Sequence, residues 1–140
     1  MSKPPSWKQF VTGKLLCHNV LSGVVLMSCQ AQPFYTFGEL EHLTPEDLKQ
    51  FLNAFTHPQR DDGSKTSPRS FHIRTSHTDY MDFKVYQKSY CSIYATSEGS
   101  SDGLVICNLP YGLLVCTYHR PIQDGHAIQV IENFCDLLRA

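Results

Sequence analysis

The residues best suited to chemistry in this sequence are its seven histidines and six cysteines. Imidazole and thiolate groups bind zinc and act as general bases or nucleophiles. Their spacing does not match a zinc site, because the sequence contains neither a CxxC pair nor an HExxH motif. His72 and His77 flank a predicted turn and so do not share one helical face. We therefore expect no bound metal and no other cofactor.

A catalytic cysteine would need a basic partner, and Cys116 with His119 or His126 comes closest to that arrangement. A reactive thiol also needs an exposed site and a lowered pKa. Cys116 lies instead within an apolar run, which predicts a buried and inert thiol. Glycine-rich phosphate loops are also missing from the sequence. We therefore expect a binding protein rather than an enzyme.

Composition points to one soluble domain spanning residues 1–140. The length is typical of a single domain, and 41% hydrophobic residues suffice for a core of its own. The formal net charge of −1 gives no overall attraction to nucleic acid or to an anionic membrane. The first residues contain no apolar signal core, and no apolar run approaches the roughly 20 residues that span a bilayer. We expect a cytoplasmic protein with reduced cysteines, no membrane span and no nucleic-acid partner.

Two strands and a closing helix are predicted in the last third of the chain. The apolar runs 103–108 and 112–118 are separated by the turn residues 110–112, which predicts a hairpin with a buried face. Asp124 can cap a helix that follows them. The apolar positions of this helix recur at helical spacing and are Ala127, Ile128, Ile131, Phe134, Cys135 and Leu138.

The N-terminal part predicts a short helix and two strands. Ser6 and Gln9 have the form of a capping box, so a helix should begin at Ser6. The apolar face of this helix would consist of Trp7, Phe10, Val11 and Leu15. The run 23–27 predicts a strand buried on both faces, and 34–37 predicts a second strand ended by Gly38.

The best-specified local element is a helix introduced by Thr44. Thr44 is a preferred N-cap, Pro45 suits the first helical position, and acidic residues 46–47 favour the positive end of the helix dipole. The polar stretch 57–68 that follows this helix predicts an exposed loop. Ser67 in that loop precedes a proline and is a candidate for phosphorylation.

From Ser70 onward the hydrophobic period shortens toward two, which predicts half-buried antiparallel strands. The inward positions would be Phe71, Ile73, Phe83, Val85, Gln87, Cys91, Ile93 and Ala95. An antiparallel sheet with helices on its faces belongs to the α+β class.

Taken in order, these elements resemble the profilin family over nearly the whole chain. The resemblance rests on a first helix opening with Trp7, the stretch 43–46, the strand meander, and the apolar strand 113–118 before a short last helix. It is greatest to a divergent member, the fourth vertebrate (testis-type) profilin. The family implies a sheet of about six to seven antiparallel strands, with the N- and C-terminal helices on one face and a further helix on the other.

The resemblance implies binding of proline-rich peptides in a groove of aromatic residues, because rings match a preformed polyproline helix. The matching positions here are Trp7, Phe10, Phe34, Tyr35 and Leu137. Asp136 stands where the family usually has a histidine, and the chain stops before the family's terminal tyrosine. We expect a weakened or altered groove, since a carboxylate does not stack and is costly to desolvate. Alternatively, Trp7 and Phe10 only pack against the terminal helix.

The resemblance also implies an actin-binding face on the meander strands and the start of the last helix. The residues in the matching stretches are Lys84, Lys88, Arg120 and His126. Residues 121–126 do not reproduce the lysine-rich, His-Gly-Gly-containing segment of the family, so we expect weak or absent actin binding. A basic cluster of the kind that meets phosphoinositides in relatives is not evident, which leaves phosphoinositide binding open.

Three hypotheses follow from these observations. The first, which we favour, is a profilin-type cytoskeletal adaptor for proline-rich partners with little actin affinity. The second is a regulator that sequesters actin monomers. The third is a roadblock- or longin-like scaffold that dimerises through a sheet edge or helix. We expect a monomer, which would count against the third.

Overall fold

The computed structural model describes residues 7–30, 32–41, 43–56, 70–73, 81–88, 91–97, 102–110, 112–119 and 122–139. The helices are α1 (Trp7–Lys14), a 3₁₀ turn η1 (Leu16–His18), α2 (Pro45–Thr56) and α3 (Asp124–Arg139). The strands are β1 (Gly23–Ser28), β2 (Pro33–Gly38), β3 (Ser70–Ile73), β4 (Met81–Lys88), β5 (Ser92–Ser97), β6 (Asp102–Leu109) and β7 (Gly112–His119).

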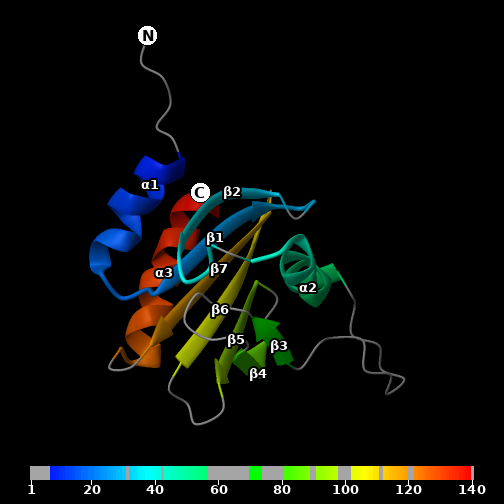
Figure 1. Ribbon diagram of the computed structural model, residues 1–140. Helices are drawn as coiled ribbons and strands as arrows, with labels where there is room; N and C mark the ends of the chain where they lie inside the picture. The colour runs from blue at the N-terminus through cyan, green and yellow to red at the C-terminus, as the bar shows by residue number, and fades with distance from the viewer. Residues whose placement is uncertain are drawn as a thin grey trace.

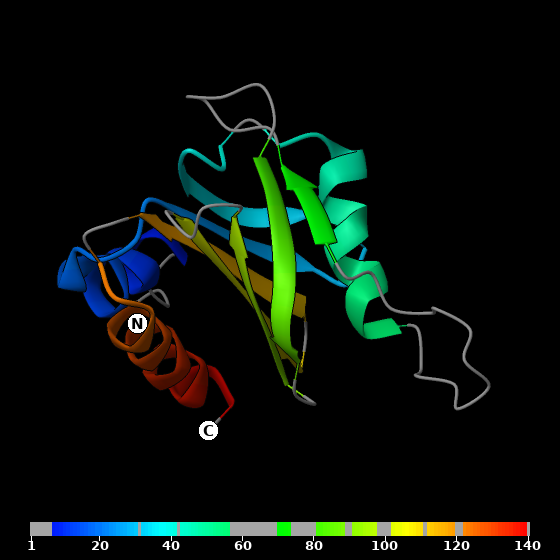
Figure 2. The same cartoon turned by 90° about the horizontal axis from the view of Figure 1, so that it is seen from below.

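The seven strands form one antiparallel sheet in the order β2-β1-β7-β6-β5-β4-β3. Figures 1 and 2 show α1 and α3 on one face of this sheet and α2 on the other. The predicted α+β class, strand number and helix placement are therefore confirmed.

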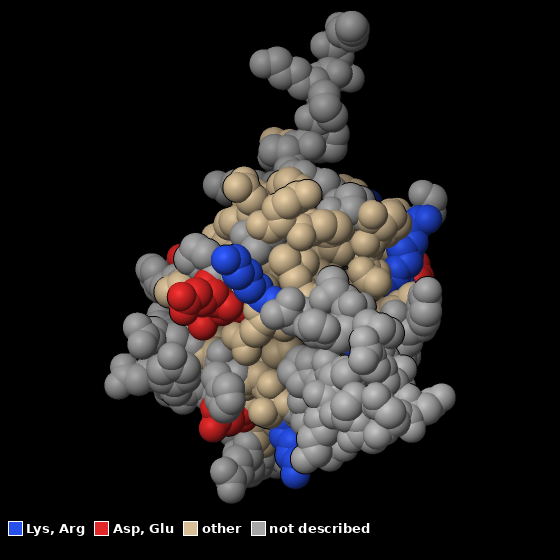
Figure 3. Space-filling model, turned by 90° about the vertical axis from the view of Figure 1, so that its right-hand side faces the viewer, with Lys and Arg blue, Asp and Glu red and all other residues tan. Residues whose placement is uncertain are grey.

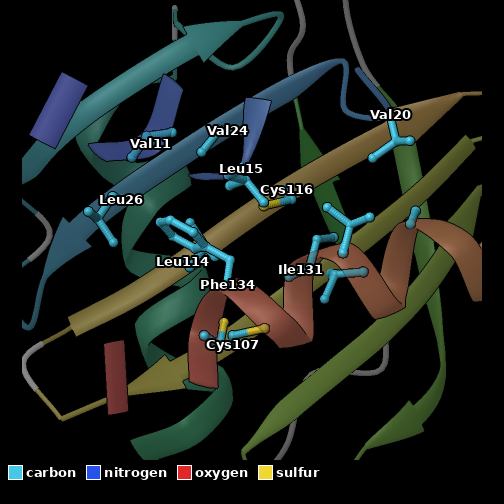
Figure 4. Packing of buried hydrophobic residues seen from close by; sticks show 14 of the residues in the cluster. Val11, Leu15, Val20, Val24, Leu26, Cys107, Leu114, Cys116, Ile131 and Phe134 are labelled. Carbon is cyan, nitrogen blue, oxygen red and sulfur yellow. The ribbon is translucent and has the colours of Figure 1, made fainter. Parts of the chain in front are cut away.

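Each face of the sheet carries its own core. On the α1–α3 side, Val11 of α1, Leu15 directly after α1 and Phe134 of α3 pack over β1, β6 and β7 (Figure 4). On the α2 side, Phe51 packs against Phe71, with ring centroids 5.5 Å apart. Alternate residues of β1, β6 and β7 enter the two cores, so these strands are buried on both faces. This was predicted for β1, whereas only one buried face was predicted for the β6–β7 hairpin.

The start of α2 has the predicted cap. Thr44 Oγ1 accepts the Asp47 backbone N–H at 3.2 Å, and Asp47 Oδ2 accepts the Thr44 backbone N–H at 3.0 Å. These two bonds satisfy two donors that the first helical turn would otherwise leave unpaired. The expected helix start is therefore confirmed, with Asp47 completing a reciprocal capping box.

Three details of the sequence prediction are wrong. Gln87 is exposed because the register of β4 against β5 shifts between Val85 and Gln87, and Cys91 is exposed because it precedes β5. Asp124 is not the cap of α3, since the first intrahelical bond runs from Ala127 N–H to the Gln123 carbonyl. The capping role predicted for Ser6 and the loop predicted over 57–68 with Ser67 lie outside the described residues and stay predictions.

Candidate functional site

The residues predicted to line a peptide groove lie on α1, on β2 and at the C-terminal end of α3. Figures 1 and 2 show α1 and α3 on the same face of the sheet. The rings of Phe10 on α1 and Phe134 on α3 pack with centroids 5.4 Å apart, and α1 also contacts β2. The fold thus assembles three elements that are far apart in the sequence.

The predicted groove residues include both supporting and exposed side chains. Phe10 and Tyr35 are half-buried and pack against the α1–α3 core. Phe34 is 44% exposed and Leu137 is 54% exposed. The side chain of Trp7 lies outside the described residues. The described part of the site is therefore an apolar base with two apolar side chains open to solvent.

Phe34 lies at a bulge in β2. Leu26 of β1 pairs with Tyr35, whereas Met27 pairs with Pro33, so Phe34 is the extra residue. A bulge bends its strand and redirects the extra side chain. Because β2 is an edge strand, this change interrupts only its single ladder with β1. The sequence pattern did not reveal the bulge, although Pro33 is typical of an edge strand.

A family model described as Profilin matches residues 5–140. The chain belongs to the profilin family. This membership replaces the alternative of a roadblock- or longin-like scaffold. No significant match was found among curated proteins.

Solved profilin structures share the fold of this profilin at low identity. Profilin II of Acanthamoeba castellanii is 20% identical, with a TM-score of 0.72 over 95% of this chain and 96% of that one. LokiProfilin1 in a complex with rabbit actin is 15% identical, with a TM-score of 0.73 over 98% of both chains. Mouse profilin IIa in complex with a double repeat from the FH1 domain of mDia1 is 12% identical, with a TM-score of 0.63 over 96% and 97%. At these identities the likeness concerns the fold alone.

The C-terminal helix of this profilin is fixed against the sheet by Glu132. Glu132 Oε1 accepts the Ser92 hydroxyl at 2.7 Å and the Tyr94 hydroxyl at 3.0 Å. Burial, reinforced by the hydrogen bond to Glu132, raises the pKa of Tyr94 to about 12. Arg139 donates to the Asn108 carbonyl at 3.0 Å and extends the attachment to the last turn. These contacts fix the rotation of α3 and thereby the direction in which Leu137 projects.

Sequence analysis missed Glu132 and Arg139, because both lie beside the apolar stripe and their partners come from distant strands. The only sign of this role in the sequence is that both residues are charged and lie at the edge of the apolar face of the helix.

Asp136 is the exposed neighbour of Leu137 on α3. Its side chain is 74% exposed, and its Oδ1 lies 3.9 Å from Arg139 NH1. A pair at this distance and exposure contributes little to stability. Asp136 therefore presents negative charge to any ligand that covers Leu137.

The first turn of α3 is attached to the sheet through Tyr118. Its hydroxyl donates to Asp124 Oδ1 at 2.6 Å. Burial, together with this bond, raises the pKa of Tyr118. The Asp124 carboxylate thus links α3 to β7 instead of capping its own helix.

The four predicted actin-facing residues do not form one described patch. Lys84 pairs with Thr96, whereas Lys88 pairs with Ile93 of the α2-side core. Since the bulge at residue 86 reverses the alternation, the two lysines lie on opposite faces of the sheet. Burial lowers the pKa of Lys88, in keeping with its place beside that core. His126 is exposed in the first turn of α3, and Arg120 lies outside the described residues.

The cysteines divide into three buried and three exposed free thiols. Burial raises the pKa of Cys116 well above its ordinary value, as expected for an inert core thiol. Within the described residues, no group of three His, Cys, Asp or Glu side chains is arranged to hold a metal ion. No helix in the described part of the chain is long and apolar enough to cross a membrane.

Proposed function

We propose that this profilin is a cytoskeletal adaptor in the cytoplasm that binds proline-rich peptides across α1, β2 and the last turns of α3. One observation carries the proposal. The large apolar side chains exposed among the described residues are Phe34, Tyr86 and Leu137, and two of these three lie on the elements that meet α1. Large apolar side chains left exposed on neighbouring elements are typical of binding surfaces.

The chemistry of a proline-rich ligand suits this surface. A polyproline helix is already ordered in solution, so it loses little conformational entropy on binding, and its ridges pack between apolar and aromatic side chains. Phe34 and Leu137 offer such contacts, while Phe10, held against Phe134, supplies a rigid base. The complex of mouse profilin IIa with an FH1 repeat supports this class of partner.

Asp136 alters the groove. A ligand that covers Leu137 would partly desolvate the neighbouring carboxylate, which opposes the binding of a purely apolar peptide. A lysine or arginine beside the prolines would offset this cost. We therefore propose that the preferred ligands carry basic residues next to their prolines.

We also propose that affinity for actin monomers is low. Lys84 and Lys88 lie on opposite faces of the sheet, so they cannot act together on one partner. The sequence resemblance to the divergent fourth vertebrate profilin supports the same expectation. If actin is nevertheless a partner, stoichiometric addition of the protein will slow polymerisation of pyrene-labelled actin, and a clear effect of this kind would favour the sequestering function instead.

A phosphoinositide partner has little support. On the face seen in Figure 3, the described basic side chains lie apart from one another, and some of them lie beside acidic side chains. Such an arrangement does not concentrate positive charge for an anionic headgroup.

Calorimetric titration with a proline-rich peptide tests the adaptor function. Wild type should bind saturably, and Phe34→Ala and Leu137→Ala should each weaken binding roughly tenfold, since one apolar contact of this kind contributes about 1–2 kcal/mol. Gln129→Ala on the exposed side of α3 is the matched control and should bind like wild type. Equal binding by all four proteins, or none by wild type at millimolar peptide, would refute the proposal.

A further inference from the structure

A buried polar cluster lies on the α2 side of the sheet, where β2 and β7 end and β6 begins. Its centre is Glu39, which directly follows β2 and whose side chain is only 2% exposed. Glu39 Oε1 accepts the Ser22 hydroxyl at 2.9 Å, and Glu39 Oε2 lies 2.7 Å from His119 Nε2. The other ring nitrogen, His119 Nδ1, contacts Asp102 Oδ1.

This arrangement determines the charge of His119. A carboxylate oxygen only accepts hydrogen bonds, so a ring nitrogen that faces one must carry a proton. Both ring nitrogens of His119 face carboxylates, and only the imidazolium form has two N–H donors. With both carboxyl groups ionised, the arrangement favours the imidazolium form of His119, which would offset the burial of the Glu39 charge.

Glu39 and Asp102 are the ionisable groups that contact the ring among the described residues. Burial alone would lower the pKa of His119, but the hydrogen bonds to these two carboxylates outweigh it and raise the pKa above its usual value near 6.5.

The backbone around the cluster is tightly fitted. The Glu39 N–H donates to the Ser22 carbonyl at 3.1 Å, and the Ser22 N–H donates to the Thr117 carbonyl at 2.8 Å. Gly38 has a φ of 66° and lies against Ser22, where an added Cβ would come within 2.1 Å of the Ser22 carbonyl oxygen. The side chains of Ser22 and Thr117 also bond, at 3.1 Å. The end of the edge strand β2 is thus connected to β7 through Ser22 and through His119.

We propose that protonated His119 is a pH-sensitive clasp, which holds the turn at Gly38 and Glu39 on the end of β7 and releases it when the proton is lost. Neutral imidazole has one N–H, so one ring nitrogen would then turn a lone pair toward a carboxylate. The buried Glu39 charge would also lose its cation, which is unfavourable. The turn follows the edge strand β2, which pairs with β1 alone, so fewer backbone hydrogen bonds hold it than hold a central strand.

The direction of the pH effect follows from the raised pKa of His119. The stabilisation by the clasp is complete below about pH 6.5, the ordinary value for the unfolded chain, and is lost as pH rises through the higher value of the folded protein. Opening is therefore expected as pH rises above about 6.5 and through this raised pKa of His119.

NMR titration of the histidine ring signals between pH 5.5 and 9 tests the clasp directly, with His119 assigned by the loss of its signal in His119→Gln. The expected midpoint lies above 6.5 in wild type and falls by about one pH unit or more in Glu39→Gln, since a nearby opposite charge contributes shifts of this size. The matched control Glu41→Gln removes an exposed carboxylate two residues away and should leave the midpoint unchanged.

Hydrogen exchange of the Glu39 and Ser22 amides provides the second readout. It compares wild type with His119→Gln, so it remains informative even if Glu39→Gln does not fold. After correction for the intrinsic pH dependence, exchange in wild type should rise at least tenfold as pH crosses the His119 midpoint, and His119→Gln should lack this rise. A wild-type midpoint at or below 6.5, or the same rise in His119→Gln, would overturn the proposal.

Discussion

Replacing Gly103 by alanine is expected to destabilise the fold, because the ring of Tyr118 lies directly on this glycine. The two residues are paired across β6 and β7. A Cβ at position 103 would lie 2.0 Å from Tyr118 Cζ and 2.4 Å from its hydroxyl oxygen. The ring would have to move, and the 2.6 Å hydrogen bond from Tyr118 to Asp124 would be lost or lengthened.

The magnitude follows from two effects. Forcing an extra methyl group into a packed site costs about 1–3 kcal/mol. Loss of a hydrogen bond to a carboxylate costs about 1.5–3 kcal/mol, while the reduced entropy of the unfolded chain returns up to about 1 kcal/mol. We expect a net loss of about 1.5–6 kcal/mol in the free energy of unfolding, or a fall in Tm of roughly 5–25 °C for a domain of this size.

Urea unfolding followed by circular dichroism measures this loss, and two variants separate its parts. Tyr118→Phe removes the hydrogen bond without overpacking and should cost about 1.5–3 kcal/mol. Gly13→Ala is the matched glycine control, since an added Cβ there meets no atom within 4 Å and should stabilise α1 by up to about 1 kcal/mol. A Gly103→Ala protein within 0.5 kcal/mol of wild type would refute the reasoning.

Three further predictions concern the cap, the core and the groove. Thr44→Ala should lower the free energy of unfolding by about 1 kcal/mol through loss of the α2 cap, and an unchanged urea midpoint would contradict this. Phe51→Ala should cost about 3–5 kcal/mol by leaving a cavity beside Phe71, which thermal unfolding would detect; a loss below 1 kcal/mol would mean that the site collapses. Asp136→His should strengthen binding of an uncharged polyproline peptide severalfold in calorimetry, whereas weaker binding would show that the carboxylate is favourable.

Local sequence rules predicted the elements whose signals are contained within one segment. The start of α2 is specified by Thr44 and its neighbours, and the burial of β1 on both faces follows from its unbroken apolar run. The helix pattern of α3 also identified Phe134 and Ile131, although it missed Val130, which is buried.

Features that depend on distant residues could not be predicted. The bulge at residue 86 adds one residue to β4 without any change in composition, yet it moves Lys88 to the opposite face from Lys84. The partners of Glu39 come from strands far along the chain, so its burial has no local signal. At the proposed groove, the exposure of Phe34 depends on a second bulge, which the sequence pattern did not reveal.

The most direct test of the proposed groove is the intrinsic fluorescence of Trp7 during titration with a proline-rich peptide. Trp7 is the single tryptophan of the chain and lies at the start of α1, so its emission reports on this region alone. We predict a saturable change in emission whose midpoint moves to higher peptide concentration in Leu137→Ala. Unchanged emission up to millimolar peptide, or a midpoint unaffected by Leu137→Ala, would contradict peptide binding at the junction of α1, β2 and α3.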